Sequence, residues 1–246
     1  ELTRKVNYFG TVTLVKVLQE VCPKAFFPYP PSVSVYGDRT ENPWISVHDP
    51  LIPSEGDYYA LTKIEAELFI RESNIHYTIF RLTGIMGHPK PDPLMFHMPL
   101  QTKMEIATTW DTANALVNAL EHQKKLVGRT FNLGGGEGCR TTYYDFLVRM
   151  FDLYGLNPKH IKREAFAEKN FHCGYFKDSD ELEEILHFRT TDLTQYYEYI
   201  KQHTNPIVHL FTRIFSRPVL YFLTNRSEPL QSKKQKDQAM INPFFK

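Results

Sequence analysis

The feature that most constrains the fold of this 246-residue sequence is an alternation of two apolar patterns. Short runs rich in β-branched and aromatic residues, at 77–82 and 129–133, each lead into a glycine-bearing turn. Segments with apolar residues at helical spacing, at 58–73 and 109–122, lie before each run. Strands that are separated by helices pair in parallel, because the helix carries the chain back across the sheet. The sequence therefore predicts an α/β fold with a parallel sheet.

The first third of the sequence fits this pattern with one conflict. Residues 1–21 have apolar side chains at near-helical spacing, and the aromatic run AFFPYPPSVSVYGD at 25–38 follows. The run suggests a strand that ends in a functional loop. Pro28, Pro30 and Pro31 lie inside it, and proline removes a hydrogen-bond donor that a central strand needs. The sequence alone leaves this conflict open.

The remaining segments complete the alternation. Proline-rich or polar residues predict loops over 38–56 and 88–103. Further helices are predicted over 141–155, 178–188 and 190–203. Residues 206–224 are strongly apolar but contain Arg213 and Arg217, which favours a segment that docks on the core or on a second subunit, with contact to one membrane leaflet as the alternative. The lysine-containing end, 225–246, is expected to be a solvated tail.

Composition excludes several classes of function. The 29 Lys and Arg residues balance 28 Asp and Glu residues, so nothing indicates a nucleic acid or an anionic surface as the main partner. The three cysteines are far apart and no C-x-x-C occurs, which argues for reduced thiols in a cytoplasmic protein. His172 beside Cys173 has no further ligand at metal spacing, so no metal site is predicted. The sequence shows no signal-peptide pattern, and no uncharged apolar run in it is long enough to span a bilayer.

The stretch GDYYALTKIEAE, residues 56–67, contains the pattern that points to chemistry. Tyr59 and Lys63 are four apart, so on a helix they share one face. An ammonium group near a phenol favours the phenolate and moves the phenol pKa toward neutrality. Such a tyrosine can act as a general acid or base toward an alcohol or carbonyl oxygen. The pair alone is common by chance, so its weight depends on context.

The context is an ordered set of short motifs. VNYFGT contains Asn7, SVSVYGD contains Ser32 four residues before Tyr36, and FRLTGIMG follows the tyrosine and lysine. TTWDTANALVNAL, FNLGGGEG and DSDELEEILHF come after them in that order. Together they resemble the extended short-chain dehydrogenase/reductases, the group of nucleotide-sugar epimerases, dehydratases and related reductases. The resemblance covers nearly the whole sequence up to about residue 200, and it implies a Rossmann-like doubly wound sheet, N-terminally incomplete, with a smaller C-terminal substrate lobe.

By this resemblance, Tyr59 is the catalytic acid/base, and Lys63 lowers its pKa and binds the nicotinamide ribose. Ser32 polarises the substrate oxygen, with Ser34 as the weaker candidate for a substrate contact. Asn7 helps to organise the site. The segment Thr83, Gly84 and Ile85 lies against the nicotinamide end of the cofactor, which is NAD or NADP. Hydride passes between the cofactor and the substrate carbon, while Tyr59 handles the proton.

The sequence also departs from the family pattern. The G-x-x-G-x-x-G fingerprint that cradles the pyrophosphate is absent, and roughly 70–100 residues of strands and helices are expected to precede this chain at about 30 per βαβ unit. The glycines at 134–138 do not replace it. Gly84 and Met104 stand where nucleotide-sugar epimerases usually carry Asn and Arg. Arg140 is a candidate anion ligand for the substrate, with a solvated arginine at a helix start as the alternative.

The function predicted is therefore an NAD(P)-dependent oxidoreductase or epimerase/dehydratase on a sugar nucleotide or another alcohol or carbonyl. One alternative is a membrane-associated dehydrogenase of a lipid or sterol-like substrate, and another is a non-catalytic binding relative. Helix 58–73 is expected to form a homodimer, by resemblance. The nucleotide-binding domain would comprise 1–87 with 105–135, and the substrate lobe 88–104 with 136–224.

Overall fold

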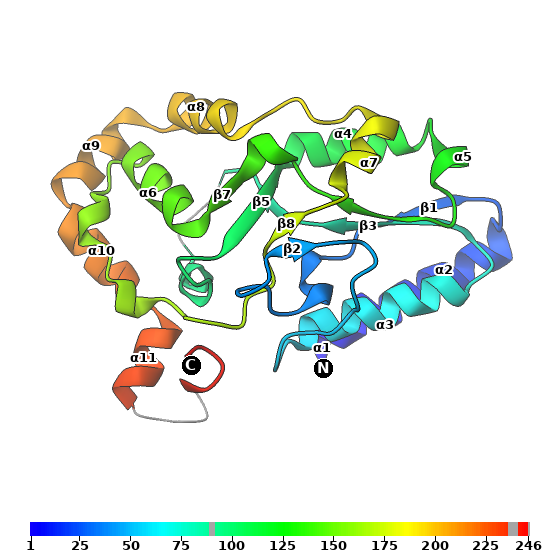
Figure 1. Cartoon of the computed structure of the whole chain (residues 1–246), viewed down its shortest axis with the longest axis horizontal. Helices are drawn as coiled ribbons and strands as arrows, with labels where there is room; N and C mark the ends of the chain where they lie inside the picture. Colours follow the sequence, from blue (N-terminus) through cyan, green and yellow to red (C-terminus); the bar gives the residue numbers. More distant parts are fainter. Residues whose placement is uncertain (89–91, 236–240, 246) are drawn as a thin grey trace.

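The structure is a computed structural model that describes residues 1–88, 92–235 and 241–245. Its centre is a parallel three-stranded sheet in the order β1 (Phe26–Tyr29), β3 (His76–Leu82) and β6 (Thr130–Leu133) (Figure 1). Tyr29 pairs with Ile79 in register, and Ile79 pairs with Thr130. The predicted α/β class with a parallel sheet is confirmed.

Helices cover both faces of this sheet, as a doubly wound fold requires. The continuous N-terminal helical run and α3 (Tyr58–Glu72) lie on one face, and α4 (Thr109–Ala119) and α7 (Ser179–Leu186) lie on the other (Figure 1). The N-terminal run consists of α1 (Leu2–Arg4), the π-helical turn η1 (Lys5–Phe9) and α2 (Gly10–Val21). Successive residues of β3 serve the two faces: Ile79 packs with Val15, and Phe80 packs with Ala115. The β-branched and aromatic residues of β3 predict a strand, although Thr78 and Arg81 interrupt its apolar run.

A second small sheet joins the first at its end. β5 (Lys103–Thr108) lies between β4 (Gly84–Met86), which is parallel to it, and β7 (Arg140–Thr142), which is antiparallel. β5 was not predicted, because the charged but fully buried Glu105 interrupts its apolar pattern. Of the loop expected over 88–103, residues 89–91 lie outside the described residues.

The C-terminal part has a core of its own, built on α6 (Tyr143–Leu153), α8 (Leu193–His203) and α10 (Ser216–Thr224). Phe146, Tyr196 and Leu220 are among its buried side chains. The domain bounds proposed from the sequence stay a prediction. The remaining elements are short: β2 (Trp44–Ile45), β8 (Tyr175–Phe176), η2 (Val33–Tyr36), η3 (Pro93–His97), α5 (Gln123–Leu126), η4 (Glu137–Cys139), η5 (Pro158–His160), η6 (Arg163–Ala165), α9 (Pro206–Ile214) and α11 (Glu228–Gln235).

The proline conflict in the aromatic run has a simple resolution. β1 is only four residues long and lies at the edge of its three-stranded sheet, where it pairs with β3. An edge strand tolerates the missing donor of Pro28. Pro30 and Pro31 lie beyond the strand, and Ser32 then bridges to Leu82 before the 3₁₀ turn η2 begins.

The two C-terminal segments agree with the expectation only in part. Within 206–224, α10 packs Leu220 into the core, whereas α9 buries none of its residues and contacts the rest of the lobe through Thr212. Docking of this segment on a second subunit stays a prediction. In the expected tail, the described residues include helix α11, and Ser232 and Phe245 are buried. Residues 236–240 and 246 of that segment lie outside the described residues. Within the described parts of the chain, no helix combines the length and the apolar character that crossing a membrane requires.

Candidate active site

Tyr59 and Lys63 lie on one face of α3, next to the edge strand. The helix begins there because the Asp57 carboxylate caps it by accepting the Ala60 N–H at 2.8 Å. The Lys63 Nζ lies 5.6 Å from the centre of the Tyr59 ring and 5.7 Å from the centre of the Tyr29 ring. Tyr59 is 43% exposed.

Ser32 meets Tyr59 from the sheet side. Its backbone follows β1 and bridges to Leu82, and its hydroxyl accepts the Ser34 N–H at 3.2 Å to start η2. The same hydroxyl hydrogen-bonds the Tyr59 side chain, which favours the phenolate and lowers the Tyr59 pKa. The strand end and the helix therefore bring a serine and a tyrosine hydroxyl to one point.

The net pKa of Tyr59 contradicts the expectation of a shift toward neutrality. Burial raises the Tyr59 pKa above its ordinary value, the hydrogen bond from Ser32 lowers it, and the negative Asp57 raises it further. Burial also lowers the pKa of Lys63. The ammonium lies over the tyrosine ring and is itself partly desolvated, so it gives the phenolate little support. In the chain alone Tyr59 is thus a protonated phenol at neutral pH, ready to donate a proton.

Asn7 reaches the same helix from the N-terminal run. It lies in the π-helical turn η1, and its Nδ2 donates to the Thr62 Oγ1 at 3.2 Å. Thr62 Oγ1 in turn donates to the Tyr59 carbonyl at 2.8 Å, and Thr11 Oγ1 donates to the Asn7 carbonyl at 2.7 Å. Single π-turns inside α-helices are frequent at functional sites. Asn7 thus contacts the backbone of the tyrosine through one intermediate residue.

The segment predicted to face the nicotinamide lies at the carboxyl end of β3. The Thr83 N–H donates to Leu133, and its hydroxyl donates to the Glu105 carbonyl. Gly84 and Ile85 continue into β4. Because Ser32 bridges to Leu82, this segment and Ser32 occupy the same edge of the sheet. Ligands of open α/β sheets bind outside the carboxyl ends of the strands.

The two predicted substrate residues are placed differently. Ser34 is buried next to Ser32, and its hydroxyl has no hydrogen-bond partner among the described residues. Arg140 lies on β7, where Nε donates to the Glu105 carboxylate at 2.9 Å and Nη2 donates to the Phe176 carbonyl at 2.8 Å. The structure thus engages Arg140 with a buried acid and does not bring it to Ser32. Its role as an anion ligand stays a prediction.

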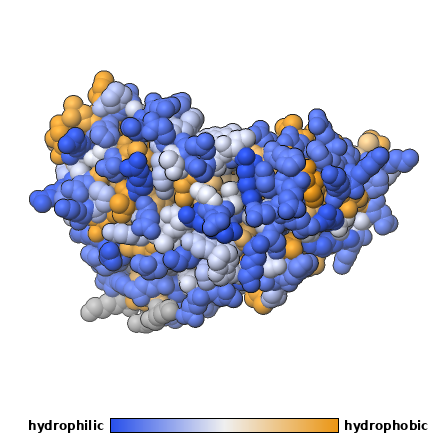
Figure 2. Space-filling model, turned by 45° about the horizontal axis from the view of Figure 1, so that its top comes forward, coloured by the Kyte–Doolittle hydropathy of each residue, from blue (hydrophilic) through white to orange (hydrophobic). Residues whose placement is uncertain are grey.

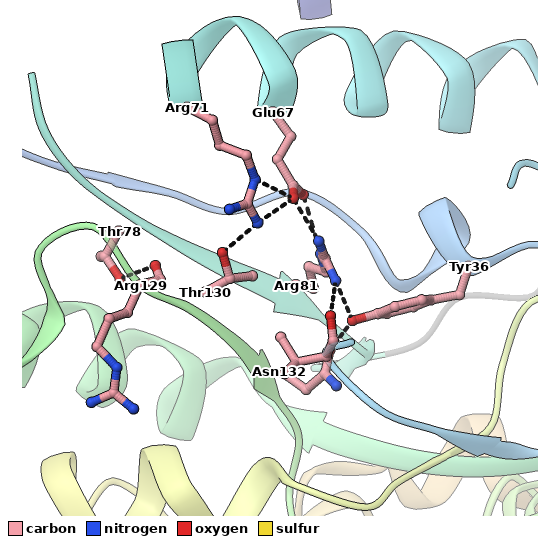
Figure 3. A network of polar contacts seen from close by, with 9 residues as sticks. Tyr36, Glu67, Arg71, Thr78, Arg81, Arg129, Thr130 and Asn132 are labelled. Atoms are coloured by element: carbon pink, nitrogen blue, oxygen red, sulfur yellow. Dashed lines mark hydrogen bonds and ion pairs between the residues drawn. The ribbon is translucent and has the colours of Figure 1, made fainter. Parts of the chain in front are cut away.

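The sequence reasoning missed a buried polar network below the site (Figure 3). The fully buried Glu67, one turn beyond Lys63, accepts two hydrogen bonds from Arg81 of β3. Arg81 also donates to the Tyr36 hydroxyl at 2.7 Å, and that hydroxyl donates to Asn132 at 2.6 Å. The Asn132 Nδ2 in turn donates a hydrogen bond to the Asp178 Oδ1 at 2.7 Å, which extends the network. A glutamate on the inner face of a helix and an arginine inside an apolar strand are complementary signals that could have revealed it.

An open hollow of about 540 Å³ lies beside this network. Tyr36, Asp38, Arg39, Glu55 and Lys169 are among its lining residues. Ser32, Tyr59 and Lys63 do not line it. The hollow is therefore adjacent to the V-Y-G turn and separate from the three converging side chains.

Comparison with known proteins rests on structure. No protein-family model and no curated protein matches the sequence. A UDP-glucuronic acid 4-epimerase from Bacillus cereus, solved with NAD, superposes with a TM-score of 0.60 at 21% identity over 80% of this chain and 66% of its own. A dTDP-glucose 4,6-dehydratase from Bacillus anthracis, also solved with NAD, superposes with a TM-score of 0.66 at 18% identity, over 81% of this chain and 67% of its own. A short-chain dehydrogenase/reductase superfamily protein from Agrobacterium tumefaciens with bound NAD superposes with a TM-score of 0.55 at 16% identity, over 94% of this chain and 75% of its own.

This chain has the extended short-chain dehydrogenase/reductase fold. It spans about two thirds of the length of the epimerase and the dehydratase. The fold predicted from the ordered motifs is confirmed, including the Rossmann-like parallel sheet.

The residues present fit the nicotinamide end of a dinucleotide. Lys63 is half-buried, and among the described residues it makes no hydrogen bond or ion pair, only its contacts with two aromatic rings. A partly desolvated ammonium without an anionic partner suits the hydroxyl groups of a ribose. The Tyr59 side chain, which meets Ser32, and the backbone at Thr83 lie at the same sheet edge. The sequence contains no fingerprint for the pyrophosphate.

Proposed function

We propose that this chain carries the catalytic residues of an NAD(P)-dependent oxidoreductase or epimerase that acts on an alcohol or carbonyl carbon of a sugar nucleotide. The observation that supports this most directly is the meeting of Ser32, Tyr59 and Lys63 at the carboxyl edge of the parallel sheet. The sugar-nucleotide class is drawn from the UDP-glucuronic acid epimerase and the dTDP-glucose dehydratase whose fold the chain shares.

The geometry supports one role for each of these residues. The Ser32 hydroxyl and the Tyr59 hydroxyl both hydrogen-bond the substrate oxygen. The bond from Ser32 keeps this oxygen next to the phenol of Tyr59. Tyr59 donates its proton to a carbonyl oxygen during reduction, and it accepts the proton of the hydroxyl during oxidation. Lys63 binds the ribose and gains a partner for its ammonium. The nicotinamide supplies the hydride donor or acceptor.

A simple redox or epimerase reaction fits these residues better than the elimination of water. Elimination needs a further acid and base beside the carbon chain of the sugar. Among the described residues, Asp57 is the carboxylate whose charge acts on Tyr59, and it is already occupied as the cap of α3. Ser34, buried beside Ser32, is a hydroxyl and cannot replace a carboxylate base at neutral pH.

We also propose that the protein is a homodimer through α2 and α3. The outer faces of these helices expose apolar side chains that no described part of the chain covers. They include Leu14 and Val17 of α2 and Leu61 and Leu68 of α3. Their exposed fractions lie near one half, which is unusual for large side chains aligned on neighbouring helices.

The test is a turnover assay with NAD and UDP-glucuronic acid or UDP-glucose, with the product sugar identified by NMR. Tyr59→Phe should lower turnover by about 10²- to 10⁴-fold, because it removes the acid/base group. Binding of the reduced cofactor, followed by fluorescence, should remain nearly unchanged. Tyr58→Phe is the matched control, because Tyr58 is the neighbouring and far more exposed tyrosine. Near-normal turnover of Tyr59→Phe, or equal losses in both variants, would refute the assignment.

A further inference from the structure

Helix α9 presents its apolar face to solvent. Ile207, Leu210, Phe211 and Ile214 recur at the spacing of one helical face, and each is more than half exposed. In a surface helix of a globular protein this stripe normally faces the core. On the opposite side of α9, the Thr212 hydroxyl donates a hydrogen bond to the Tyr154 carbonyl, and this contact holds the helix in place. The outward direction of the stripe is thus fixed by contacts on the other side.

The exposed apolar surface continues onto α10. The Phe211 and Phe215 rings lie 4.7 Å apart between the two helices, and Tyr221 and Phe222 of α10 are each about 60% exposed. On its other side α10 buries Leu220 and Thr224 in the C-terminal core. Figure 2 shows hydrophobic residues gathered at the end of the molecule that carries α9 and α10 in Figure 1. We call the exposed side chains of 207–222 the α9–α10 surface.

The charge around this surface is predominantly positive. From 199 to 227 the sequence has no Asp or Glu, and it contains Lys201, Arg213, Arg217 and Arg226. Arg226 lies 5.7 Å from the centre of the Phe222 ring. Lys162, from the neighbouring segment 153–167, lies 5.6 Å from the centre of the Tyr221 ring. That neighbouring segment contains one acidic residue, Glu164. The exposed aromatic side chains are thus flanked by cations.

This charge decides between two kinds of partner. A second copy of the chain that met this surface across a two-fold axis would set arginine against arginine, which is repulsive. The exposed face of the N-terminal helical run and α3 differs, because it carries charges of both signs, such as the ion pair between Arg4 of α1 and Glu65 of α3. An anionic lipid surface attracts each added Lys or Arg and accepts apolar side chains at its interface.

We propose that the α9–α10 surface binds an anionic lipid bilayer, with the apolar stripe inserted at the level of the headgroups and the arginines on the phosphates. The contact is peripheral, since the described helices include none that could cross the bilayer. It would place the C-terminal lobe against the membrane and leave α2 and α3, at the other end of the molecule, free (Figure 1). The proposal does not depend on the reaction that Tyr59 catalyses.

The experiment is co-sedimentation of the whole chain with two kinds of vesicle. One is phosphatidylcholine alone, and the other contains phosphatidylcholine and phosphatidylglycerol in equal amounts. The chain should sediment with the anionic vesicles, remain in solution with the neutral ones, and dissociate as salt is raised. The variant Leu210→Gln/Phe211→Gln/Ile214→Gln should bind at least about tenfold more weakly. Arg213→Glu/Arg217→Glu should show a loss of about tenfold or more.

The matched control is Val117→Gln/Leu120→Gln, which removes comparably exposed apolar side chains from the C-terminal end of α4, outside the proposed dimer face. It should bind the anionic vesicles like the unchanged chain. Circular dichroism should show all variants folded, because every changed side chain is exposed. Three outcomes overturn the proposal: an unchanged chain that stays in solution with anionic vesicles, a control that loses as much binding as the α9 variant, or an α9 variant that becomes a smaller oligomer without lipid.

Discussion

The Glu67 carboxylate accepts two hydrogen bonds from the Arg81 guanidinium, 2.6 Å from Nη2 to Oε1 and 3.1 Å from Nε to Oε2. Both side chains are buried, one on the helix of Tyr59 and Lys63 and the other on the central strand β3. The ion pair therefore joins the helix that carries the candidate acid/base to the strand whose end faces the candidate cofactor site. Two parallel hydrogen bonds also fix the orientation of α3 relative to β3, because a planar guanidinium can donate two bonds to one carboxylate in only a few geometries.

Glu67→Gln should destabilise the chain by about 3–5 kcal/mol, because it leaves the buried charge of Arg81 without its counterion. Urea denaturation gives the free energy of unfolding. Glu65→Gln on the same helix is the control, since its ion pair with Arg4 lies at the surface and should be worth about 1 kcal/mol or less. Equal losses in the two variants would mean that the buried pair does not organise α3.

Lys63→Met should separate function from stability. Burial lowers the Lys63 pKa, which means that the folded chain disfavours its charge. Removing the ammonium should therefore leave the melting temperature unchanged or slightly higher. Binding of the nicotinamide cofactor should weaken about 10- to 100-fold, because hydrogen bonds to a charged donor are lost. Lys16→Met, at an exposed position of α2, should change neither quantity. A strongly destabilised Lys63→Met would show a structural role instead.

His172 gives the chain a predicted weakness in acid. Burial lowers its pKa below the ordinary value of 6.5, although the nearby Asp57 and Asp38 oppose the shift. Below pH 6.5 the unfolded chain therefore binds a proton that the folded chain does not, so the stability falls as the pH falls toward the lower folded-state pKa. In that window the loss is at most about 1.4 kcal/mol per pH unit.

His172→Gln removes this titration. Between pH 7.5 and pH 5.5, the free energy of unfolding should fall less steeply in this variant than in the unchanged chain. His76→Gln, which changes an exposed histidine, should keep the steep fall. If the two variants and the unchanged chain have the same slope, His172 does not control acid stability.

Much of the fold follows from local patterns because those patterns have one physical cause. β3 is buried on both faces, and its β-branched and aromatic residues predict a strand even though Arg81 interrupts the apolar run. α3 has a capping residue, Asp57, and apolar side chains at helical spacing. These two elements need no information beyond neighbouring residues. The meeting of Ser32 with Tyr59 and Lys63 was implied instead by the family resemblance of the ordered motifs, because the prolines before Ser32 left its strand open.

The parts that could not be predicted depend on partners far away in the chain. β5 contains Glu105, whose carboxylate is satisfied by Gly136, Arg140, Phe176 and Ser179. A buried charge looks like a loop residue until those partners are known. The Tyr59 pKa was predicted from the spacing to Lys63, but it depends on burial, which spacing does not report. The exposure of α9 is likewise a tertiary property, since its sequence pattern is that of a core-facing helix.

The cysteines should differ sharply in reactivity. Burial raises the pKa of the Cys139 and Cys173 thiols to about 12, whereas Cys22 is exposed. The thiolate is the reactive form, so a thiol reagent such as DTNB should modify one cysteine of the native chain rapidly and all three after denaturation. Cys22→Ser should abolish the rapid reaction. A rapid reaction that persists in Cys22→Ser would show that one of the buried thiols becomes accessible.

The homodimer proposed through α2 and α3 can be tested at Leu68, which is half exposed on the outer face of α3. Leu68→Glu would place two negative charges in a symmetric interface, because a two-fold axis brings the same residue from each copy. Dissociation should become about a hundredfold easier or more, as for a side chain at the centre of an interface. Light scattering after size exclusion should find twice the chain mass for the unchanged protein and one chain mass for Leu68→Glu. Phe211→Glu, an equally exposed change on α9, should remain dimeric. A dimer that survives Leu68→Glu but dissociates in Phe211→Glu would move the interface to α9 and would also contradict lipid binding by that helix.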